Sequence, residues 1–253
     1  SPGFSIYKKV ADLIDINVIE IPLTPDLNFN LESIIAAGQK ARVIFLGSPH
    51  NPTGQTLSRQ QVEEILTQVS SLVVLDEAYA EFSKETTVPL LSSYDNLLIL
   101  RTFSKAFRLA GARFGYALGQ PDTIQALQAA RLPFSVGLFQ QIAAEVLLEE
   151  KDCLQNEIQQ TIKERERLFN LLQVFKTLRP LPSKANFLLV ESTFLTAEEI
   201  FRRLLARGIL VRIFNHPELK NRFRVTIGQP QDNDRLLAAL QEIEKEVLND
   251  QKS

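Results

Sequence analysis

The sequence has few of the residues that build disulfides, metal sites and membrane spans. It contains a single cysteine, Cys153, and two histidines that lie far apart, so it has no pair for an internal disulfide and no ligand set for zinc. Its apolar runs are much shorter than the roughly 20 residues of a membrane-spanning helix, and it shows no signal peptide. These absences favour a cytoplasmic protein without a metal site and without a membrane partner.

The chain also lacks an excess of charge of either sign. It has 28 Lys and Arg against 30 Asp and Glu in 253 residues, a formal net charge of −2, and no basic block. This balance argues against nucleic acid as the main partner. The 45% hydrophobic content, 10 Gly and 12 Pro are ordinary for a globular protein, which excludes a disordered or collagen-like chain.

Three short apolar runs in the first half are typical of strands buried on both faces. They cover residues 43–46, 72–75 and 97–100. A helix is predicted between the first two runs, because Ser58 and Gln61 form a capping-box pattern, and an earlier helix is predicted from Asn30 to Gly38. Strands that alternate with helices predict an α/β fold, with a mostly parallel sheet sandwiched by helices.

The second half has a different pattern. Residues from about 137 to 175 are predicted to form a mostly helical stretch, and a helix of that length usually bridges two domains. We interpret the charged run at 163–167 as its solvated face. We therefore predict a partial large domain at 1–150, a connecting helix at 151–176, and a small C-terminal α+β domain at 177–253.

The small domain is predicted from shorter patterns. Apolar runs at 186–190 and 209–211 flank a capped helix from Thr196 to Gly208, where Glu199 completes the capping box. Residues 223–227 alternate as in a half-exposed strand. A last helix is predicted to bury four residues, which are Leu236, Leu240, Ile243 and Val247.

Polar residues follow each of the three buried strands directly. They occupy residues 48–54, 76–79 and 101–105. Ligands of open α/β sheets bind outside the carboxyl ends of the strands, so these three segments should converge on one crevice. That convergence favours an enzyme over a scaffold.

These residue types suit the chemistry of pyridoxal phosphate. A lysine in a partly desolvated crevice loses its proton more easily and can form a Schiff base with a carbonyl. A carboxylate at the pyridine nitrogen keeps that nitrogen protonated, and the pyridinium then withdraws electrons from the substrate. Hydroxyls and N–H groups at a helix start suit the phosphate, and arginine adds a bidentate clamp.

Three motifs carry a specific resemblance. They are Asn-Pro-Thr-Gly at 51–54, Asp-Glu-Ala-Tyr at 76–79 and Ser-Lys-Ala-Phe-Arg-Leu-Ala-Gly-Ala-Arg-Phe-Gly-Tyr at 104–116. With Asn-Phe at 186–187 and Arg-Val-Thr at 224–226, they resemble the fold-type I pyridoxal-phosphate aminotransferases, and most closely the histidinol-phosphate aminotransferase family.

The resemblance implies how the ring of the cofactor would be held. Lys105 would bind it covalently and shuttle the proton, and Asp76 would pair with the pyridine nitrogen. Asn51 and Tyr79 would hydrogen-bond its phenolic oxygen, and Phe4 would stack on the ring. Taken alone, Tyr79 and Phe4 could equally be core residues.

The resemblance also implies where anions would bind. Thr102, Ser104 and Arg113 would hold the cofactor's phosphate, although Arg113 alone could be a surface ion-pair residue. Arg224 and Arg212 would bind the carboxylate or phosphate of the substrate. On an alternating strand, Arg224 could instead point to solvent.

The activity implied is that of a ping-pong aminotransferase with a small-molecule amino donor and a 2-oxo acid acceptor. The preferred pair would be histidinol phosphate and 2-oxoglutarate, in histidine biosynthesis. An aromatic aminotransferase or a decarboxylase of phosphorylated amino acids is the alternative within the same class. Family members form homodimers, and we expect one here.

A final absence concerns the start of the chain. The sequence has no methionine, not even an initiator. Family members carry an N-terminal segment with a phosphate-binding loop before the point that matches residue 1. We therefore expect an N-terminally truncated enzyme, and a catalytically impaired fragment stays open as a further alternative.

Overall fold

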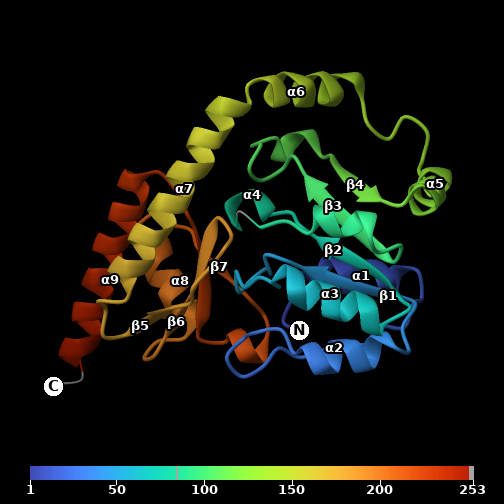
Figure 1. Ribbon diagram of the computed structural model, residues 1–253. Helices are drawn as coiled ribbons and strands as arrows, with labels where there is room; N and C mark the ends of the chain where they lie inside the picture. The colour runs from blue at the N-terminus through green and yellow to red at the C-terminus, as the bar shows by residue number, and fades with distance from the viewer. Residues whose placement is uncertain (84, 251–253) are drawn as a thin grey trace. The chain divides into compact units, whose positions relative to one another are not determined.

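The computed structural model describes residues 1–83 and 85–250. By its internal contacts the chain divides into two compact units, whose elements are labelled in Figure 1. Unit 1 holds residues 1, 3–51 and 55–158, and unit 2 holds residues 2, 52–54 and those from 159 onward.

Unit 1 is built on a four-stranded sheet. Its strands are β1 (Val43–Gly47), β2 (Leu72–Asp76), β3 (Leu97–Thr102) and β4 (Gly115–Gly119). They lie in the order β1-β2-β3-β4, and the first three are parallel while β4 runs antiparallel to β3. The predicted mostly parallel sheet is therefore confirmed. Strand β4 was not predicted; its first two residues are the end of the motif at 104–116.

The helices of unit 1 follow their sequence signals where a cap is present. They are α1 (Ile6–Leu13), α2 (Leu31–Gly38), α3 (Arg59–Gln68), α4 (Ala80–Ser83), α5 (Pro121–Ala130) and α6 (Leu138–Glu149), with 3₁₀ turns η1 (Val88–Ser92) and η2 (Ala110–Ala112). Asn30 caps α2, and Ser58 and Gln61 form the predicted capping box of α3. Apolar residues of α2 and α3 pack on the sheet and form the core of unit 1.

Strand β1 corrects one prediction. Leu46 is buried and Ile44 packs against the core, but Val43 is 43% exposed and Phe45 is 50% exposed. Successive side chains of a strand point to opposite faces, so the outer face of β1 is open to solvent. The prediction that this run is buried on both faces is wrong.

The long helix also differs from the prediction. It is broken at Glu150, whose backbone (φ −85°, ψ 30°) ends α6, and α7 (Lys151–Leu172) begins directly after it. Only part of the charged run on α7 is solvated: Lys163 and Glu166 are exposed, but Glu164 and Arg165 are buried. Arg165 Nη1 donates to the carbonyl of Ala185 at 3.0 Å, and Glu164 accepts from Asn233 at 2.9 Å. Charged residues can be buried when partners satisfy them, and these partners lie far away in the sequence.

Unit 2 is an antiparallel sheet covered by helices. The strands β5 (Leu178–Pro180), β6 (Phe187–Ser192), β7 (Arg212–Ile213) and β8 (Arg222–Thr226) lie in the order β5-β6-β8-β7. The remaining elements are α8 (Ala197–Ala206), η3 (Pro217–Leu219) and α9 (Pro230–Asp250). The capping box of α8 and the buried stripe of α9 are as predicted, whereas the apolar run at 209–211 lies just before a strand, β7, that begins at Arg212.

The described residues contain neither a membrane-spanning helix nor a cluster of metal ligands. Among residues 1–83 and 85–250, no helix combines the length and apolar character needed to cross a membrane. The same part of the chain holds no group of three or more His, Cys, Asp or Glu placed to hold a metal ion.

Candidate active site

The carboxyl ends of β1, β2 and β3 meet at one edge of the sheet of unit 1. Gly47 at the end of β1 pairs with Asp76 at the end of β2, and Asp76 pairs with Leu100 of β3. Beyond these pairs, Ser48 N donates to Asp76 O and Glu77 N donates to Leu100 O, both at 2.9 Å. The three polar segments singled out in the sequence therefore start side by side.

Asp76 carries two hydrogen bonds on its carboxylate. Oδ1 accepts from the backbone N–H of Ala78 at 3.0 Å, and Oδ2 accepts from the hydroxyl of Tyr7. Burial and the charge of Asp76 raise the pKa of Tyr7 well above its ordinary value, so its phenol stays protonated and donates. Sequence analysis gave Tyr7 no role.

Lys105 and Tyr79 lie together. The ammonium nitrogen of Lys105 is 5.4 Å from the centroid of the Tyr79 ring, which is within the range of a cation–π contact. Tyr79 is buried, while Lys105 is exposed. Tyr79 thus lies in the core, as its alternative interpretation had it, and it also contacts the predicted catalytic lysine.

The segment after β3 holds the predicted phosphate ligands. Ser104 N donates to Thr102 Oγ1 at 3.0 Å, so the two hydroxyl residues belong to one turn. The rings of Phe103 and Phe114 stack at 4.5 Å and 15°, which ties this turn to the segment that carries Arg113. Among the described residues, the hydrogen bond of the Arg113 guanidinium goes to Ala110 O at 2.9 Å, and none joins it to Thr102 or Ser104.

Asn51 and Phe4 complete the predicted ring contacts. Asn51 is partly buried and follows His50, whose backbone N–H donates to Gln55 O at 2.7 Å and closes the turn after β1. Phe4 is 44% exposed, and its ring forms a T-shaped pair with the Tyr7 ring, with centroids 5.4 Å apart and an interplanar angle of 83°. Phe4 is therefore accessible to a planar ligand.

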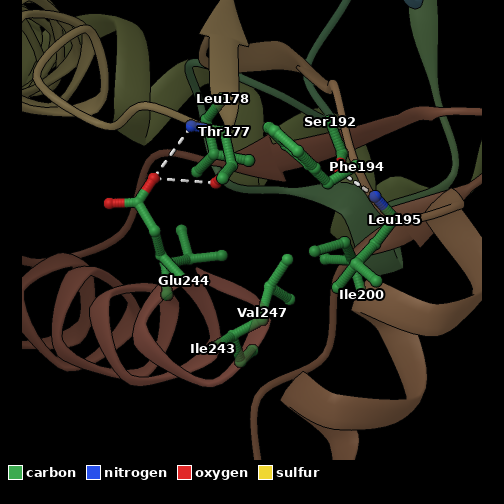
Figure 2. A pocket seen from close by; sticks show the side chains of 10 residues that line it. Thr177, Leu178, Ser192, Phe194, Leu195, Ile200, Ile243, Glu244 and Val247 are labelled. Atoms are coloured by element: carbon green, nitrogen blue, oxygen red, sulfur yellow. Dashed lines mark hydrogen bonds between the residues drawn. The ribbon is translucent and has the colours of Figure 1, made fainter. Parts of the chain in front are cut away.

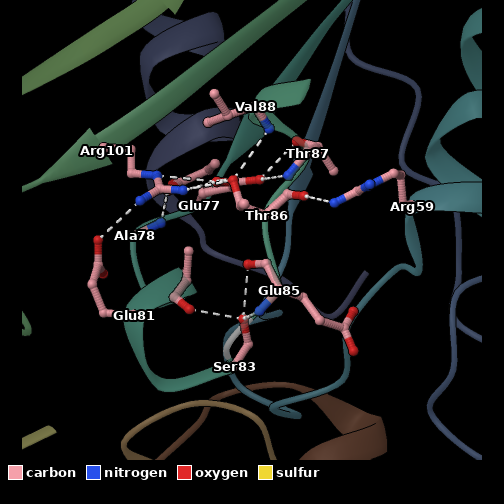
Figure 3. A network of polar contacts seen from close by, with 12 residues as sticks. Arg59, Glu77, Ala78, Glu81, Ser83, Glu85, Thr86, Thr87, Val88 and Arg101 are labelled. Atoms are coloured by element: carbon pink, nitrogen blue, oxygen red, sulfur yellow. Dashed lines mark hydrogen bonds and ion pairs between the residues drawn. The ribbon is translucent and has the colours of Figure 1, made fainter. Parts of the chain in front are cut away.

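A buried ion pair lies at the ends of β2 and β3 (Figure 3). Glu77 is 2% exposed, and its Oε2 accepts from Arg101 Nε at 3.0 Å and Nη2 at 2.6 Å. Its Oε1 accepts from the N–H and the hydroxyl of Thr87, at 2.8 and 2.7 Å, and Arg101 also pairs with Glu81 at 3.2 Å. Since Glu77 follows Asp76 and Arg101 precedes Thr102, this ion pair links the ends of β2 and β3.

Unit 2 carries the two predicted substrate arginines on adjacent strands. Arg212 of β7 is directly opposite Arg224 of β8. Arg224 lies 4.7 Å from the ring centroid of Phe187, and both guanidinium groups lie 5.8–5.9 Å from that of Phe214. Like charges opposite each other across a sheet destabilise it, so this arrangement favours binding of an anion.

A small cavity in unit 2 does not belong to these sites (Figure 2). It is mostly apolar, and none of the predicted site residues lines it. At its edge, Glu244 Oε1 accepts from the N–H and the hydroxyl of Thr177, both at 2.8 Å. These bonds tie α9 to the start of β5, so we interpret the cavity as a packing feature.

Comparison with known proteins agrees with the resemblance in the motifs. The family described as aminotransferase class I and II matches residues 1–240. A histidinol-phosphate aminotransferase of Thermococcus kodakarensis is 42% identical over 243 residues, which is 95% of this chain and 68% of that protein.

Two solved structures share the fold. The histidinol-phosphate aminotransferase from Clostridium acetobutylicum has a TM-score of 0.93 at 25% identity, covering 97% of this chain and 76% of that one. The enzyme of that name from Sinorhizobium meliloti, in complex with pyridoxal 5′-phosphate, has a TM-score of 0.88 at 29% identity, covering 96% and 68%.

The fold is that of a fold-type I aminotransferase. With the match over residues 1–240, the chain belongs to the class I and II aminotransferase family. It is thus a pyridoxal-phosphate-dependent transferase acting on amino and keto acids. The side chains at the strand ends fit this cofactor chemically, since they include a lysine amine, a carboxylate and the hydroxyls of Thr102 and Ser104.

Proposed function

We propose that this enzyme is a histidinol-phosphate aminotransferase that uses 2-oxoglutarate as the amino acceptor and works as a homodimer in the cytoplasm. The observation that carries the substrate is the arginine pair, Arg212 opposite Arg224. Histidinol phosphate carries a phosphate and 2-oxoglutarate carries two carboxylates, so both substrates are anions that need a cationic binding site. Arginine binds each of these groups through two parallel N–H bonds. The names of the similar proteins support the same choice.

We assign the reacting groups at the end of β2 and after β3. Bound pyridoxal phosphate supplies an electron sink for the negative charge that develops on the substrate carbon. The carboxylate of Asp76 holds the proton on the pyridine nitrogen. The amine of Lys105 would hold the cofactor and, once the substrate amine has displaced it, would carry a proton to and from the substrate carbon; its nitrogen lies 5.4 Å from the centroid of the Tyr79 ring.

The remaining residues orient the cofactor. Asn51 and Tyr79 donate to its phenolic oxygen, and the exposed ring of Phe4 packs on the pyridine face. The turn of Thr102 and Ser104 presents hydroxyls to the phosphate. Arg113 reaches that phosphate by exchanging its local bond to Ala110 for the stronger bond to an anion.

Covalent attachment of the cofactor at Lys105 is tested by following the absorbance of added pyridoxal phosphate. Adding pyridoxal phosphate to the protein should produce an absorbance band that borohydride traps. The band should be lost in Lys105→Ala and kept in Lys40→Ala, a lysine on the surface beyond α2. Absence of the band in the unmutated protein would contradict the assignment. A band of normal affinity in this 253-residue chain would exclude the impaired fragment.

The substrate is tested by comparing three amino donors with 2-oxoglutarate present. We expect the highest kcat/KM with histidinol phosphate, a much lower value with phenylalanine, and no release of CO₂ from threonine phosphate. Arg212→Gln and Arg224→Gln should raise KM for histidinol phosphate more than for phenylalanine, because only the former carries a phosphate. A preference for phenylalanine, or decarboxylation of threonine phosphate, would replace the proposal by one of the two alternatives.

A further inference from the structure

Tyr7 occupies a position between two residues of the candidate cofactor site. Its hydroxyl donates to Oδ2 of Asp76, and its ring forms a T-shaped contact with the Phe4 ring, with centroids 5.4 Å apart. Asp76 is assigned to the pyridine nitrogen, and Phe4 is assigned to the face of the same ring. Tyr7 is therefore in contact with both groups that define where that ring would lie.

The ring of Tyr7 is fixed by packing of α1 on the sheet. It stacks on Phe45 of β1 with centroids 5.3 Å apart and an interplanar angle of 27°. A methyl group added at Gly47, the residue paired with Asp76, would lie 3.9 Å from the hydroxyl oxygen of Tyr7. The hydroxyl thus lies at the ends of β1 and β2 and donates to Asp76.

The hydrogen bonds of Asp76 leave room for a ligand. An ionised carboxylate offers about four acceptor positions on its two oxygens. The N–H of Ala78 uses one position on Oδ1, and Tyr7 uses one on Oδ2. Two donors on different oxygens fix the plane of the carboxylate, while the remaining lone pairs stay open to an N–H of the cofactor.

We propose that Tyr7 is a positioning residue of the cofactor site, whose hydroxyl fixes the Asp76 carboxylate in the plane that meets the pyridine nitrogen. This inference rests on the proposed function, because it takes the contact between Asp76 and that nitrogen as given. It adds a residue of the first helix to a site that otherwise comes from Phe4 and from residues at and after the ends of β1, β2 and β3.

The test replaces the hydroxyl and keeps the ring. Tyr7→Phe preserves the stack on Phe45 and removes the donor to Asp76. We expect the dissociation constant for pyridoxal phosphate to rise by about tenfold, the lower range for a hydrogen bond to a charged group. The ¹⁵N NMR signal of ring-labelled cofactor should move toward the unprotonated position, because the carboxylate is free to rotate away from the nitrogen.

A matched control exists in the same unit. Tyr94 also donates its hydroxyl to a carboxylate, Oε1 of Glu63, at 2.8 Å, but on the exposed surface of α3. Tyr94→Phe should leave both the affinity and the ¹⁵N signal unchanged within about twofold. Equal behaviour of Tyr7→Phe and Tyr94→Phe would overturn the inference.

A double-mutant cycle with Asp76→Ala separates this inference from the proposed function. If Tyr7 acts through Asp76, adding Tyr7→Phe to Asp76→Ala causes no further loss of affinity. Additive losses would overturn the inference, because Tyr7 would then act independently of the carboxylate. Normal affinity in Asp76→Ala alone would overturn the proposed role of Asp76 instead.

Discussion

The two units differ in how completely they bury their apolar residues. Unit 2 packs its helices and its sheet around one core, and Phe187, Leu188 and Phe223 have almost no exposed surface. Unit 1 is larger, yet the outer face of β1 and apolar residues of α1 and α6 are exposed, including Leu13 and Phe139. The unit with the closed core holds the two arginines predicted to bind the substrate, and the unit with the open surface holds the predicted cofactor residues. We therefore expect unit 2 to gain more stability from its buried core than unit 1 does.

The largest expected effect on the unfolding free energy compares one strand phenylalanine from each sheet. Phe223 of β8 is completely buried, whereas half of the Phe45 side chain on β1 is exposed. Phe223→Ala should lower the unfolding free energy by about 3–5 kcal/mol, and Phe45→Ala by about 1 kcal/mol. Denaturant unfolding followed by hydrogen exchange in each unit measures both. Equal losses would break the comparison.

Ion pairs offer the second contrast. Glu77→Ala leaves the guanidinium of Arg101, only 16% exposed, without its main partner, and should cost about 3–4 kcal/mol. Glu191→Ala in unit 2 removes a half-exposed partner of Arg222 and should cost less than about 1 kcal/mol. Thermal and denaturant unfolding of both variants test this, and a small effect of Glu77→Ala would show that the ends of β2 and β3 are held in other ways.

The third expectation is a pH dependence that originates in unit 1. Burial of His50 lowers its pKa to about 4, against an ordinary value near 6.5. The unfolded chain then binds a proton between these values while the folded chain does not, so the unfolding free energy falls as pH decreases from about 6.5 to 4. The total loss is about 3 kcal/mol.

Two variants check this origin. His50→Gln should flatten the difference in unfolding free energy between pH 7 and pH 4.5. His216→Gln, in unit 2, should keep the slope of the unmutated protein. If His50→Gln kept that slope as well, the dependence would arise elsewhere in the chain.

The smallest expected effects compare the two capping boxes. Ser58 caps α3 in unit 1 and Thr196 caps α8 in unit 2, each with a reciprocal side-chain bond from the third helical residue. Ser58→Ala and Thr196→Ala should each cost about 1 kcal/mol. Hydrogen exchange should show the loss only in the unit that carries the variant, and loss in both units would mean that they unfold together.

Local signals predicted most of the fold. The apolar runs gave β2 and β3, and the caps at Asn30, Ser58 and Thr196 gave the starts of three helices, because each signal acts within a few residues. The break at Glu150 was missed because the sequence keeps its helical character across it. The burial of Glu164 and Arg165 depends on Asn233 and Ala185, which no local pattern could reveal.

The candidate site shows the same division. Its motif residues after β2 and β3 were found from their types and spacing, although their roles stay predictions. Tyr7 was missed because its importance comes from the packing of α1 on β1. Glu77 stood inside a quoted motif and Arg101 in the polar segment at 101–105, both without a role, since only the structure shows that they form a pair.

Asp76 and Glu77 are consecutive acidic residues with different tasks. One carboxylate meets Tyr7 at the candidate cofactor site, and the other is buried against Arg101. A shift of β2 by one residue would exchange the two faces of the strand, because its side chains alternate. Such a slip would send the acid that now pairs with Arg101 toward the candidate site and the predicted cofactor acid into the interior. The hydrogen-bond register of β2 with its neighbours thus decides which of the two adjacent carboxylates faces Tyr7 and the candidate cofactor site.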